Sequence, residues 1–198
     1  MKRLLIFALA ALASACAGLP VEPPDPHPQV LLQTSLGDIR LELDREHAPI
    51  SVANFLQYLK AGHYDGTLFH RVIPGFVAQG GGYDAAFKEK PTRAPIAIES
   101  GNGLSNLRGT LAMAREEAPN TATSQFYINL VDNLKLDPHP ENPARRWGYA
   151  VFGKVVDGMD VVDRMAAQPT GVNAALQATD VPLTNILLTH ASLLQQVR

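Results

Sequence analysis

The residues of this chain that could carry chemistry are one arginine and two glutamines, each set among apolar side chains. Arg71 keeps its charge at any relevant pH and offers a rigid fork of donors, while Gln79 and Gln125 can donate and accept hydrogen bonds. Four segments share this character: residues 69–82, 109–114, 121–128 and 149–155.

Workable arrangements for covalent, metal-dependent or phosphate chemistry are missing. No serine lies in a nucleophile elbow, and the single cysteine, Cys16, precedes the expected domain. The glycines at 80–82 fit a turn better than a phosphate loop, because no lysine follows them, and 101–103 lacks the third glycine of a dinucleotide fingerprint. No histidine pair has the close helical spacing of a metal site, so surface or structural roles are expected for His27, His47, His63, His70, His139 and His190.

Phe-His-Arg-Val-Ile-x-Gly-Phe at 69–76 and Ser-Gln-Phe-Tyr-Ile at 124–128 resemble the cyclophilin family in composition, order and spacing. The resemblance covers residues 30–188. Gly-Tyr-Ala-Val-Phe-Gly-Lys at 148–154 is similar to the bacterial periplasmic branch of that family. The resemblance implies a mainly β fold, a closed eight-stranded antiparallel barrel capped by two α-helices. It also implies a peptidyl-prolyl cis-trans isomerase that needs no cofactor and no metal.

The same resemblance implies where the active groove lies. By position, the catalytic residues are Arg71, Phe76 and Gln79. The remaining matched positions are expected to bind substrate: Val77, Met113, Ala114, Gln125, Tyr127, Leu136 and Tyr149. Gln125 fits a purely structural hydrogen-bonding role equally well, and Asn106 could shape the groove through its loop. Two other functions stay open, a non-catalytic peptide-binding or chaperone module that uses the same groove and a passive structural barrel.

Several positions depart from the commonest eukaryotic pattern of the family. Val77 stands where methionine is frequent, Tyr127 where phenylalanine is usual, and Tyr149 where a histidine is found. The Tyr127 hydroxyl therefore needs a polar partner. Lys135 stands near a position that is often tryptophan and is linked in the family to tight cyclosporin binding, so weak cyclosporin inhibition is expected. Trp147 could fill that space only if its loop folds back.

The elements that must position these residues are short. Pro49 predicts the start of a helix that ends at Gly62, and 159–165 predicts a second helix. Residues 30–35 and 38–43, with Gly37 between them, predict a hairpin. Further strands are expected at 67–72, 76–80, 96–98, 110–114, 125–130, 150–154 and 183–189.

The first 28 residues predict export. Lys2 and Arg3 precede an apolar stretch over 4–13, which is shorter than the roughly 20 residues of a membrane-spanning helix. The predicted divisions are a signal peptide over 1–15, a lipid-attachment cysteine with a proline-rich linker over 16–28, and the isomerase domain over 29–198. Leu12-Ala13-Ser14-Ala15-Cys16 resembles a bacterial lipobox, while an ordinary signal peptide beside a chance cysteine is the alternative.

These features set the expected location and partners. The chain would lie on the periplasmic side of a bacterial membrane, with the outer membrane slightly favoured by Ala17, or else be a periplasmic protein without an anchor. Loss of the signal peptide leaves 15 basic and 19 acidic residues, a formal charge of −4, so no nucleic-acid partner is expected. The expected partners are proline-containing unfolded or flexible polypeptides, with membrane contact through the lipid only, and the barrel is expected to be a monomer.

If the lipobox is functional, the mature chain begins at a diacylated Cys16. Mass spectrometry of the protein purified from membranes should find an N-terminal peptide that starts at Cys16 and carries the acyl mass. An unmodified Cys16, or a mature chain that starts after it, would contradict the lipoprotein prediction.

Overall fold

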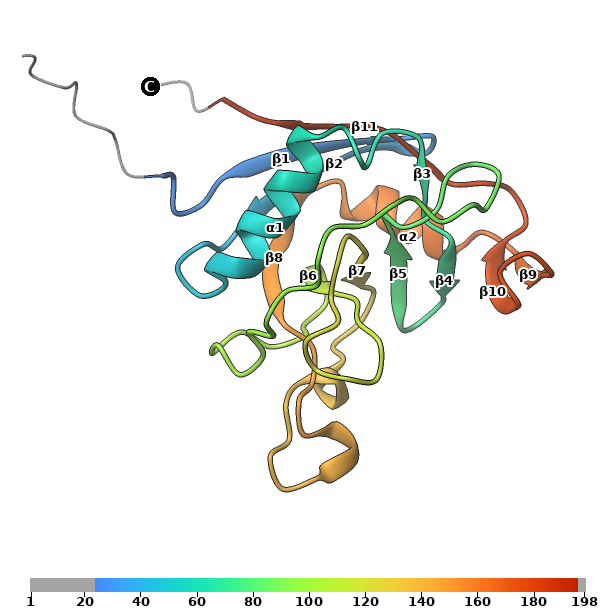
Figure 1. The fold of residues 1–198 in the computed structure, drawn as a ribbon. Helices are drawn as coiled ribbons and strands as arrows, with labels where there is room; N and C mark the ends of the chain where they lie inside the picture. The colour runs from blue at the N-terminus through green and yellow to red at the C-terminus, as the bar shows by residue number, and fades with distance from the viewer. Residues whose placement is uncertain (1–23, 196–198) are drawn as a thin grey trace, which may run out of the picture.

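Short apolar and alternating stretches become β-strands in the computed structural model, which describes residues 24–195 (Figure 1). Within these residues no helix is both long and apolar enough to cross a bilayer. In chain order the elements are β1 (Gln29–Thr34), β2 (Gly37–Leu43), α1 (Pro49–Lys60), β3 (Thr67–Leu68), β4 (Arg71–Ile73), β5 (Val77–Gly80), β6 (Thr110–Met113), β7 (Phe126–Asn129), the 3₁₀ turns η1 (Leu134–Leu136) and η2 (Pro143–Arg145), β8 (Val151–Asp157), α2 (Met159–Ala166), β9 (Thr170–Asn173), β10 (Ala178–Pro182) and β11 (Leu187–Leu193).

One antiparallel sheet of nine strands curls around the core in the order β3-β11-β1-β2-β8-β6-β7-β5-β4. Its two end strands, β3 and β4, are separated in the chain only by Phe69 and His70. Counted as one bent strand, they give the eight strands that the family resemblance implies. The mainly β fold with two α-helices is confirmed. The two ends of the sheet, however, are not hydrogen-bonded to each other; they are connected by the chain itself at residues 67–73, which we call the seam.

Some element bounds differ from the sequence-based predictions. The helices lie where expected, and Gly62, which follows α1, has the positive φ of 65° that glycine tolerates. The segment 96–98 forms only an isolated bridge from Ile96 to Ala122, because Pro91 and Pro95 interrupt any ladder there. The last strand begins at Leu187 rather than 183. The predictions also missed the β9–β10 hairpin and the turns η1 and η2.

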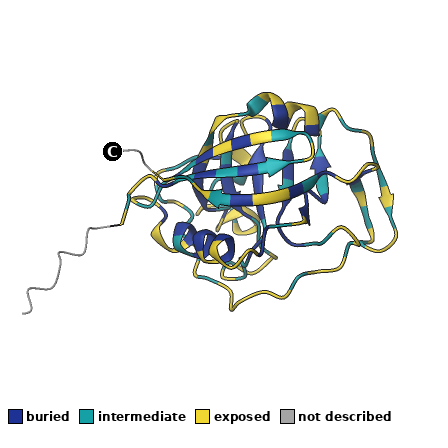
Figure 2. Cartoon of the chain, turned by 90° about the horizontal axis from the view of Figure 1, so that it is seen from above, coloured by how far each residue is buried: buried dark blue, intermediate teal, exposed yellow. Residues whose placement is uncertain are grey.

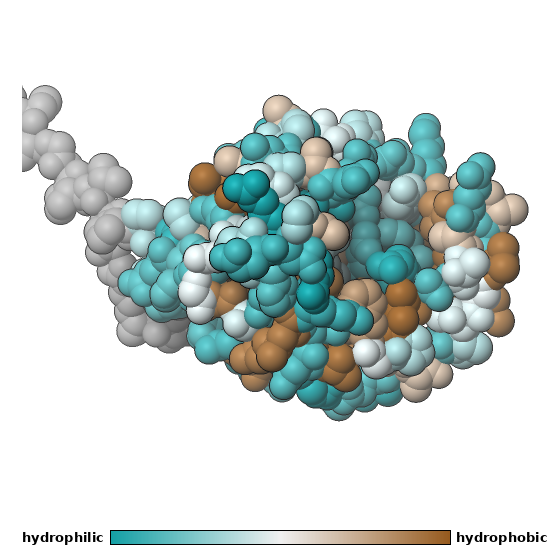
Figure 3. Space-filling view, turned by 90° about the horizontal axis from the view of Figure 1, so that it is seen from below, coloured by the Kyte–Doolittle hydropathy of each residue, from teal (hydrophilic) through white to brown (hydrophobic). Residues whose placement is uncertain are grey.

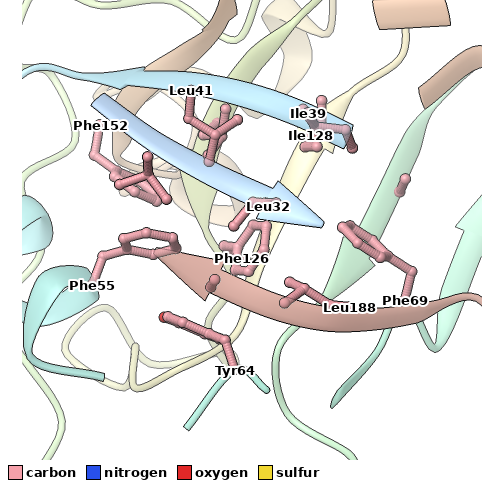
Figure 4. Close-up of a cluster of buried hydrophobic side chains, with 14 of the residues drawn as sticks. Leu32, Ile39, Leu41, Phe55, Tyr64, Phe69, Phe126, Ile128, Phe152 and Leu188 are labelled. Atoms are coloured by element: carbon pink, nitrogen blue, oxygen red, sulfur yellow. The ribbon is translucent and has the colours of Figure 1, made fainter. Parts of the chain in front are cut away.

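Aromatic rings from separate elements meet inside the barrel (Figure 4). The ring of Phe55 on α1 lies 4.8 Å from that of Tyr64 and 5.4 Å from those of Phe126 on β7 and Phe152 on β8. All four side chains are fully buried, and buried residues fill the interior of the sheet (Figure 2). Packing of these large buried rings holds β7 and β8 in place, and it therefore also fixes the position of the side chains on the outer faces of the two strands.

A buried histidine lies at the seam. The His70 side chain is 7% exposed, its ring packs edge-on against Tyr83 at 4.7 Å, and its Nδ1 atom has no hydrogen-bond partner within residues 24–195. Burial lowers the pKa of His70 from 6.5 to about 4, and the adjacent charge of Arg71 acts in the same direction. The ring is therefore neutral at neutral pH, and protonating it would place an unpaired charge at the point where the sheet closes.

We expect acid to destabilise the fold through His70. Between pH 6.5 and about 4 the unfolded chain binds a proton at this position that the folded chain does not, so the free energy of unfolding falls as pH decreases, by about 3 kcal/mol in total. Denaturant unfolding of the wild type and His70→Gln at pH 7 and pH 5 measures this, because the variant should lose less stability than the wild type. His139→Gln is the control and should lose as much stability as the wild type, because the His139 ring contacts the Leu134 carbonyl at 3.3 Å and, within residues 24–195, is in no ion pair. Equal losses in wild type and His70→Gln would refute the assignment.

Candidate active site

Pairing between four neighbouring strands places one row of side chains on the outer face of the sheet. Arg71 on β4 pairs with Gln79 on β5, which pairs with Tyr127 on β7, which pairs with Ala112 on β6. Successive residues of a strand point to opposite faces, so the adjacent row points inward. That inner row belongs to the main core: Val72, Ala78, Ile128 and Leu111.

A cavity of about 200 Å³, the groove, opens over the outer row. Eight of the ten residues predicted for the site line it, together with Arg115, which the sequence analysis did not select. These residues come from β4, β5, β7 and η1, from the turn between β4 and β5, and from the segments that follow β6 and η2, and therefore from parts far apart in the chain. The lining residues are Arg71, Phe76, Val77, Gln79, Ala114, Arg115, Tyr127, Leu136 and Tyr149.

The polar half of the groove is a short hydrogen-bonded chain. Arg71 Nη1 donates to Gln79 Oε1 at 3.3 Å, and Gln79 Nε2 donates to Gln125 Oε1 at 2.9 Å. Gln125 does not line the groove itself but fixes the amide that orients the guanidinium. Gly82 makes room for it, because a Cβ at that position would lie 2.6 Å from Gln125 Cγ. The structure therefore gives Gln125 a positioning role.

The apolar half is a small cluster separate from the main core. Val77, Ala112, Tyr127 and Val151 are buried in it, and Phe76, Leu136 and Tyr149 pack against them with partial exposure. The rings of Tyr127 and Tyr149 meet edge-on, with centroids 5.8 Å apart. Because these side chains are partly exposed, a ligand that covers them removes apolar surface from water. This burial stabilises the complex by about 25 cal/mol for each Å².

The Tyr127 hydroxyl has the partner that the sequence required. It donates to Asn106 Oδ1 at 2.8 Å, and the Tyr127 side chain is only 4% exposed. Burial raises the pKa of the Tyr127 hydroxyl well above its usual value, and nearby Tyr149 and Asp137 act in the same direction. Tyr127 therefore stays protonated, presents its ring to the groove and points its hydroxyl toward the network beneath.

A buried amide network below the groove holds the loop that carries Leu136. Asn106 donates through its backbone and side-chain nitrogens to Asp137 Oδ1, both at 2.8 Å, and accepts from Asn129 Nδ2 at 3.2 Å. Asn133 Nδ2 donates to Asn129 Oδ1 and to the Phe76 carbonyl, both at 2.9 Å. The network replaces regular secondary structure in this loop. Of these residues the sequence singled out only Asn106, because most of the partners lie 20 to 60 positions away in the chain.

One predicted groove residue lies elsewhere. The Met113 side chain is 2% exposed, belongs to the main core cluster and lines a different small hollow beside Ile96 and Ala122. The prediction that it lines the groove is wrong, because the groove side of this stretch is taken by Ala112 and Ala114, and the alternation along the strand turns Met113 inward. Met113 therefore contributes to packing.

The cations at the rim stack on aromatic rings. Lys135 Nζ lies 4.5 Å from the centroid of the Phe76 ring, and the Arg115 guanidinium lies 4.5 Å from that of Tyr149. Trp147 does not fill the place of the family's frequent tryptophan, since its side chain is 44% exposed and stacks on Arg146 at 5.3 Å. Lys135 itself covers the ring of Phe76 there.

What marks the groove as the candidate site is the chemistry of its lining residues and not its size. A larger cavity of about 540 Å³ lies between α1 and residues 93–96, but the separate buried apolar cluster lies at the groove and not at that cavity. Within residues 24–195 no group of three or more histidine, cysteine, aspartate or glutamate side chains could hold a metal ion. What the groove offers is an apolar pocket next to a permanent cation and a hydrogen-bonding amide.

The comparisons with known proteins agree on one family. A family model described as cyclophilin type peptidyl-prolyl cis-trans isomerase/CLD matches residues 29–192. Peptidyl-prolyl cis-trans isomerase A of Dickeya dadantii (strain 3937) is 43% identical over 196 residues, which cover 99% of this chain and 100% of that relative. Peptidyl-prolyl cis-trans isomerase B of Escherichia coli (strain K12) is 48% identical over 159 residues, covering 80% of this chain and 95% of the relative.

Solved structures agree with this family. A crystal structure of a cyclophilin type peptidyl-prolyl cis-trans isomerase from Cryptosporidium parvum matches with a TM-score of 0.67 at 25% sequence identity, covering 86% of this chain and 99% of that chain. A second structure of that enzyme, determined in the presence of the dipeptide Ala-Pro, matches with a TM-score of 0.65 at 26% identity.

The amide network predicts a cost for removing its centre. Asn106→Leu keeps a similar volume but removes the acceptor of the buried Tyr127 hydroxyl and the side-chain bonds to Asn129 and Asp137, so the free energy of unfolding should fall by about 2–3 kcal/mol. Asn185→Leu is the matched control, because Asn185 is exposed and makes one hydrogen bond, to the Ala85 carbonyl at 3.2 Å. Its effect should stay within about 0.5 kcal/mol. Denaturant unfolding compares the two, and similar losses in both would show that the network adds nothing.

Proposed function

The chain belongs to the cyclophilin-type peptidyl-prolyl cis-trans isomerases, and we propose that the groove is the site at which it accelerates rotation about X-Pro bonds. The observation that carries this proposal is the placement of Arg71 beside the apolar cluster within one cavity. Enzymes of this family need no cofactor, and the donors and apolar walls of the groove are supplied by the chain itself.

The reaction sets simple demands on such a site. Amide resonance gives a rotation barrier of about 18–20 kcal/mol, while the two isomers of an X-Pro bond differ by only about 0.5–1 kcal/mol. No bond is made or broken. In the twisted transition state the conjugation is lost, and the lone pair becomes localised on the proline nitrogen. A catalyst therefore has to bind the twisted form better than either planar form.

Arg71 meets this demand. Its guanidinium can donate to the proline nitrogen as the lone pair localises, and this bond is weak in the planar ground states because the lone pair is delocalised there. The bond from Arg71 Nη1 to Gln79 Oε1 holds the guanidinium in place, and Gln125 in turn fixes the Gln79 amide. The Gln79 amide can also hydrogen-bond the substrate backbone and help to position the rotating carbonyl.

The apolar half of the groove grips the proline ring. Phe76, Tyr127 and Leu136 line the same cavity as Arg71, and Val77 and Ala114 complete its walls. Tyr149 stands where relatives of the common pattern carry a histidine, and its ring packs on Tyr127, so its role is apolar contact instead of proton transfer. When the proline ring is held in place, the preceding carbonyl can turn while the rest of the substrate stays bound, and this restriction lowers the barrier to rotation.

The substrates follow from the groove and from the N-terminus. The Cryptosporidium parvum relative was studied with the dipeptide Ala-Pro, which supports proline-containing segments as substrates of this chain. Lys2 and Arg3, the apolar stretch over 4–13 and Cys16 support export and lipid attachment on the periplasmic side of a membrane, although they lie outside the described residues. The enzyme then assists the folding of exported proteins in the cell envelope.

Arg71 gives the direct test. Arg71→Ala should lower kcat/KM for cis-to-trans relaxation of an Ala-Pro peptide by more than about tenfold, because about 1.4 kcal/mol of transition-state stabilisation corresponds to each factor of ten. Arg71→Lys should recover part of the rate, since it keeps the charge but not the fork. Circular dichroism and thermal unfolding verify that each variant is folded.

The matched control is Arg93→Ala. Arg93 Nη1 also donates to a glutamine, Gln57 Oε1 at 3.2 Å, but it lines the larger cavity beside α1 and not the groove. This variant should keep the wild-type rate. Equal activity of Arg71→Ala and the parent would remove Arg71 from the mechanism. A parent protein that binds proline peptides without accelerating relaxation would favour the non-catalytic binding module.

A further inference from the structure

A second cavity adjoins the groove on the side of the loop that follows η1. This cavity, the basic pocket, has a volume of about 390 Å³ and shares Arg115, Leu136 and Tyr149 with the groove. Its lining residues are Arg115, Glu117, Lys135, Leu136, Ala144, Arg145, Gly148 and Tyr149. The loop extends away from the barrel in Figure 1, and Figure 3 views the molecule from the side toward which it extends, where apolar residues lie among hydrophilic ones.

The basic pocket carries an excess of positive charge. Arg115, Lys135 and Arg145 line it, and Glu117 is the single carboxylate in the lining. Across residues 24–195 the ion pairs within 4.0 Å involve other cations, so none of these three is neutralised by a carboxylate in contact with it. Unpaired cations around a cavity favour an anionic ligand, and partly enclosed walls strengthen that preference relative to bulk water.

Two of the cations are held in place between the two cavities. Arg115 Nε donates to the Gly148 carbonyl at 2.9 Å, and Arg115 Nη1 donates to the carbonyls of Glu116 at 2.7 Å and Glu117 at 2.9 Å. Its guanidinium also lies over Tyr149, as Lys135 lies over Phe76. Both rings line the groove, so each of the two charges is separated from the proposed proline site by a single aromatic side chain.

Arg145 completes the pocket from the far side. The turn that carries it is fixed by hydrogen bonds from Ala144 N to Asn142 Oδ1 at 3.1 Å, from Arg145 N to the Asn142 carbonyl at 3.0 Å, and from His139 N to the Arg145 carbonyl at 3.0 Å. Its neighbour Arg146 is different, because it stacks on Trp147 and does not line the basic pocket. The loop thus presents one arginine to the pocket and one away from it.

We propose that the basic pocket binds an acidic side chain of the substrate, one or two residues from the proline, and so gives the enzyme a preference for acidic segments. The inference rests on the proposed use of the groove for the X-Pro bond. An extended chain advances about 3.3–3.6 Å per residue, so a neighbouring aspartate or glutamate reaches Arg115, which lines both cavities, and Lys135, which lines the basic pocket. A carboxylate there gains charge-assisted hydrogen bonds that an amide of the same shape does not.

The test compares matched peptides on the purified mature protein. Proline peptides with Glu, Gln or Lys at one of the two positions on either side of the X-Pro bond are assayed for kcat/KM at about 20 mM and about 500 mM salt. Glu at one or more of these positions should exceed Gln by about threefold to tenfold at low salt, Lys should fall below Gln, and high salt should reduce the Glu advantage to less than about twofold. The readout is the Glu-to-Gln ratio, which is insensitive to general losses of activity.

Neighbouring arginines provide the matched variants. Arg145→Glu should bring the Glu-to-Gln ratio to about one at low salt, whereas Arg146→Glu should leave the ratio near its wild-type value. A wild-type ratio near one with all peptides isomerised would overturn the basic pocket but not the proposed isomerase site. Equal losses in both variants would assign the preference to the diffuse charge of the loop and overturn the pocket. No acceleration of any peptide would instead refute the proposed function.

Discussion

Alternation of side chains along a strand is the constraint on which this structure depends. In a curled sheet with a filled interior, each residue of β4, β5, β6 and β7 faces either the core or the outside, and a shift of one residue would exchange the two. The rings around Phe126 lock the inner face. The same registration then aligns Arg71, Gln79 and Tyr127 across three strands, so the packing of the core determines the geometry of the groove.

Where regular pairing ends, buried amides take over the positioning. The stretch between β7 and β8 has only two short 3₁₀ turns, yet it supplies Leu136 and Tyr149 to the groove. Asn106 and Asn133 bind this stretch to the strand ends through side-chain hydrogen bonds that are hidden from water. Such bonds contribute modestly when made but cost much when one partner is lost, so the loop holds one arrangement.

Charge is distributed so that the site does not depend on proton transfer. Arg71 is a permanent cation, whereas His63 and His70 are buried, and burial lowers the pKa of both. Tyr127 stays protonated for the same reason. Catalysis of rotation about an amide needs a fixed hydrogen-bond donor beside an apolar surface, and a permanent cation among neutral side chains meets that need.

The sequence by itself determined the family and the mainly β fold with two helices, and it named eight of the nine residues that line the groove, because motif spacing and strand periodicity are local properties of the chain. Only the tertiary structure decided that Met113 points into the core, that Gln125 orients Gln79 from beside the groove, and that β3 and β4 meet through the chain. It also revealed the partners of Asn106, the place of Arg115 in the groove and the basic pocket. These depend on contacts between residues far apart in the chain, and such contacts exist only once the barrel has closed.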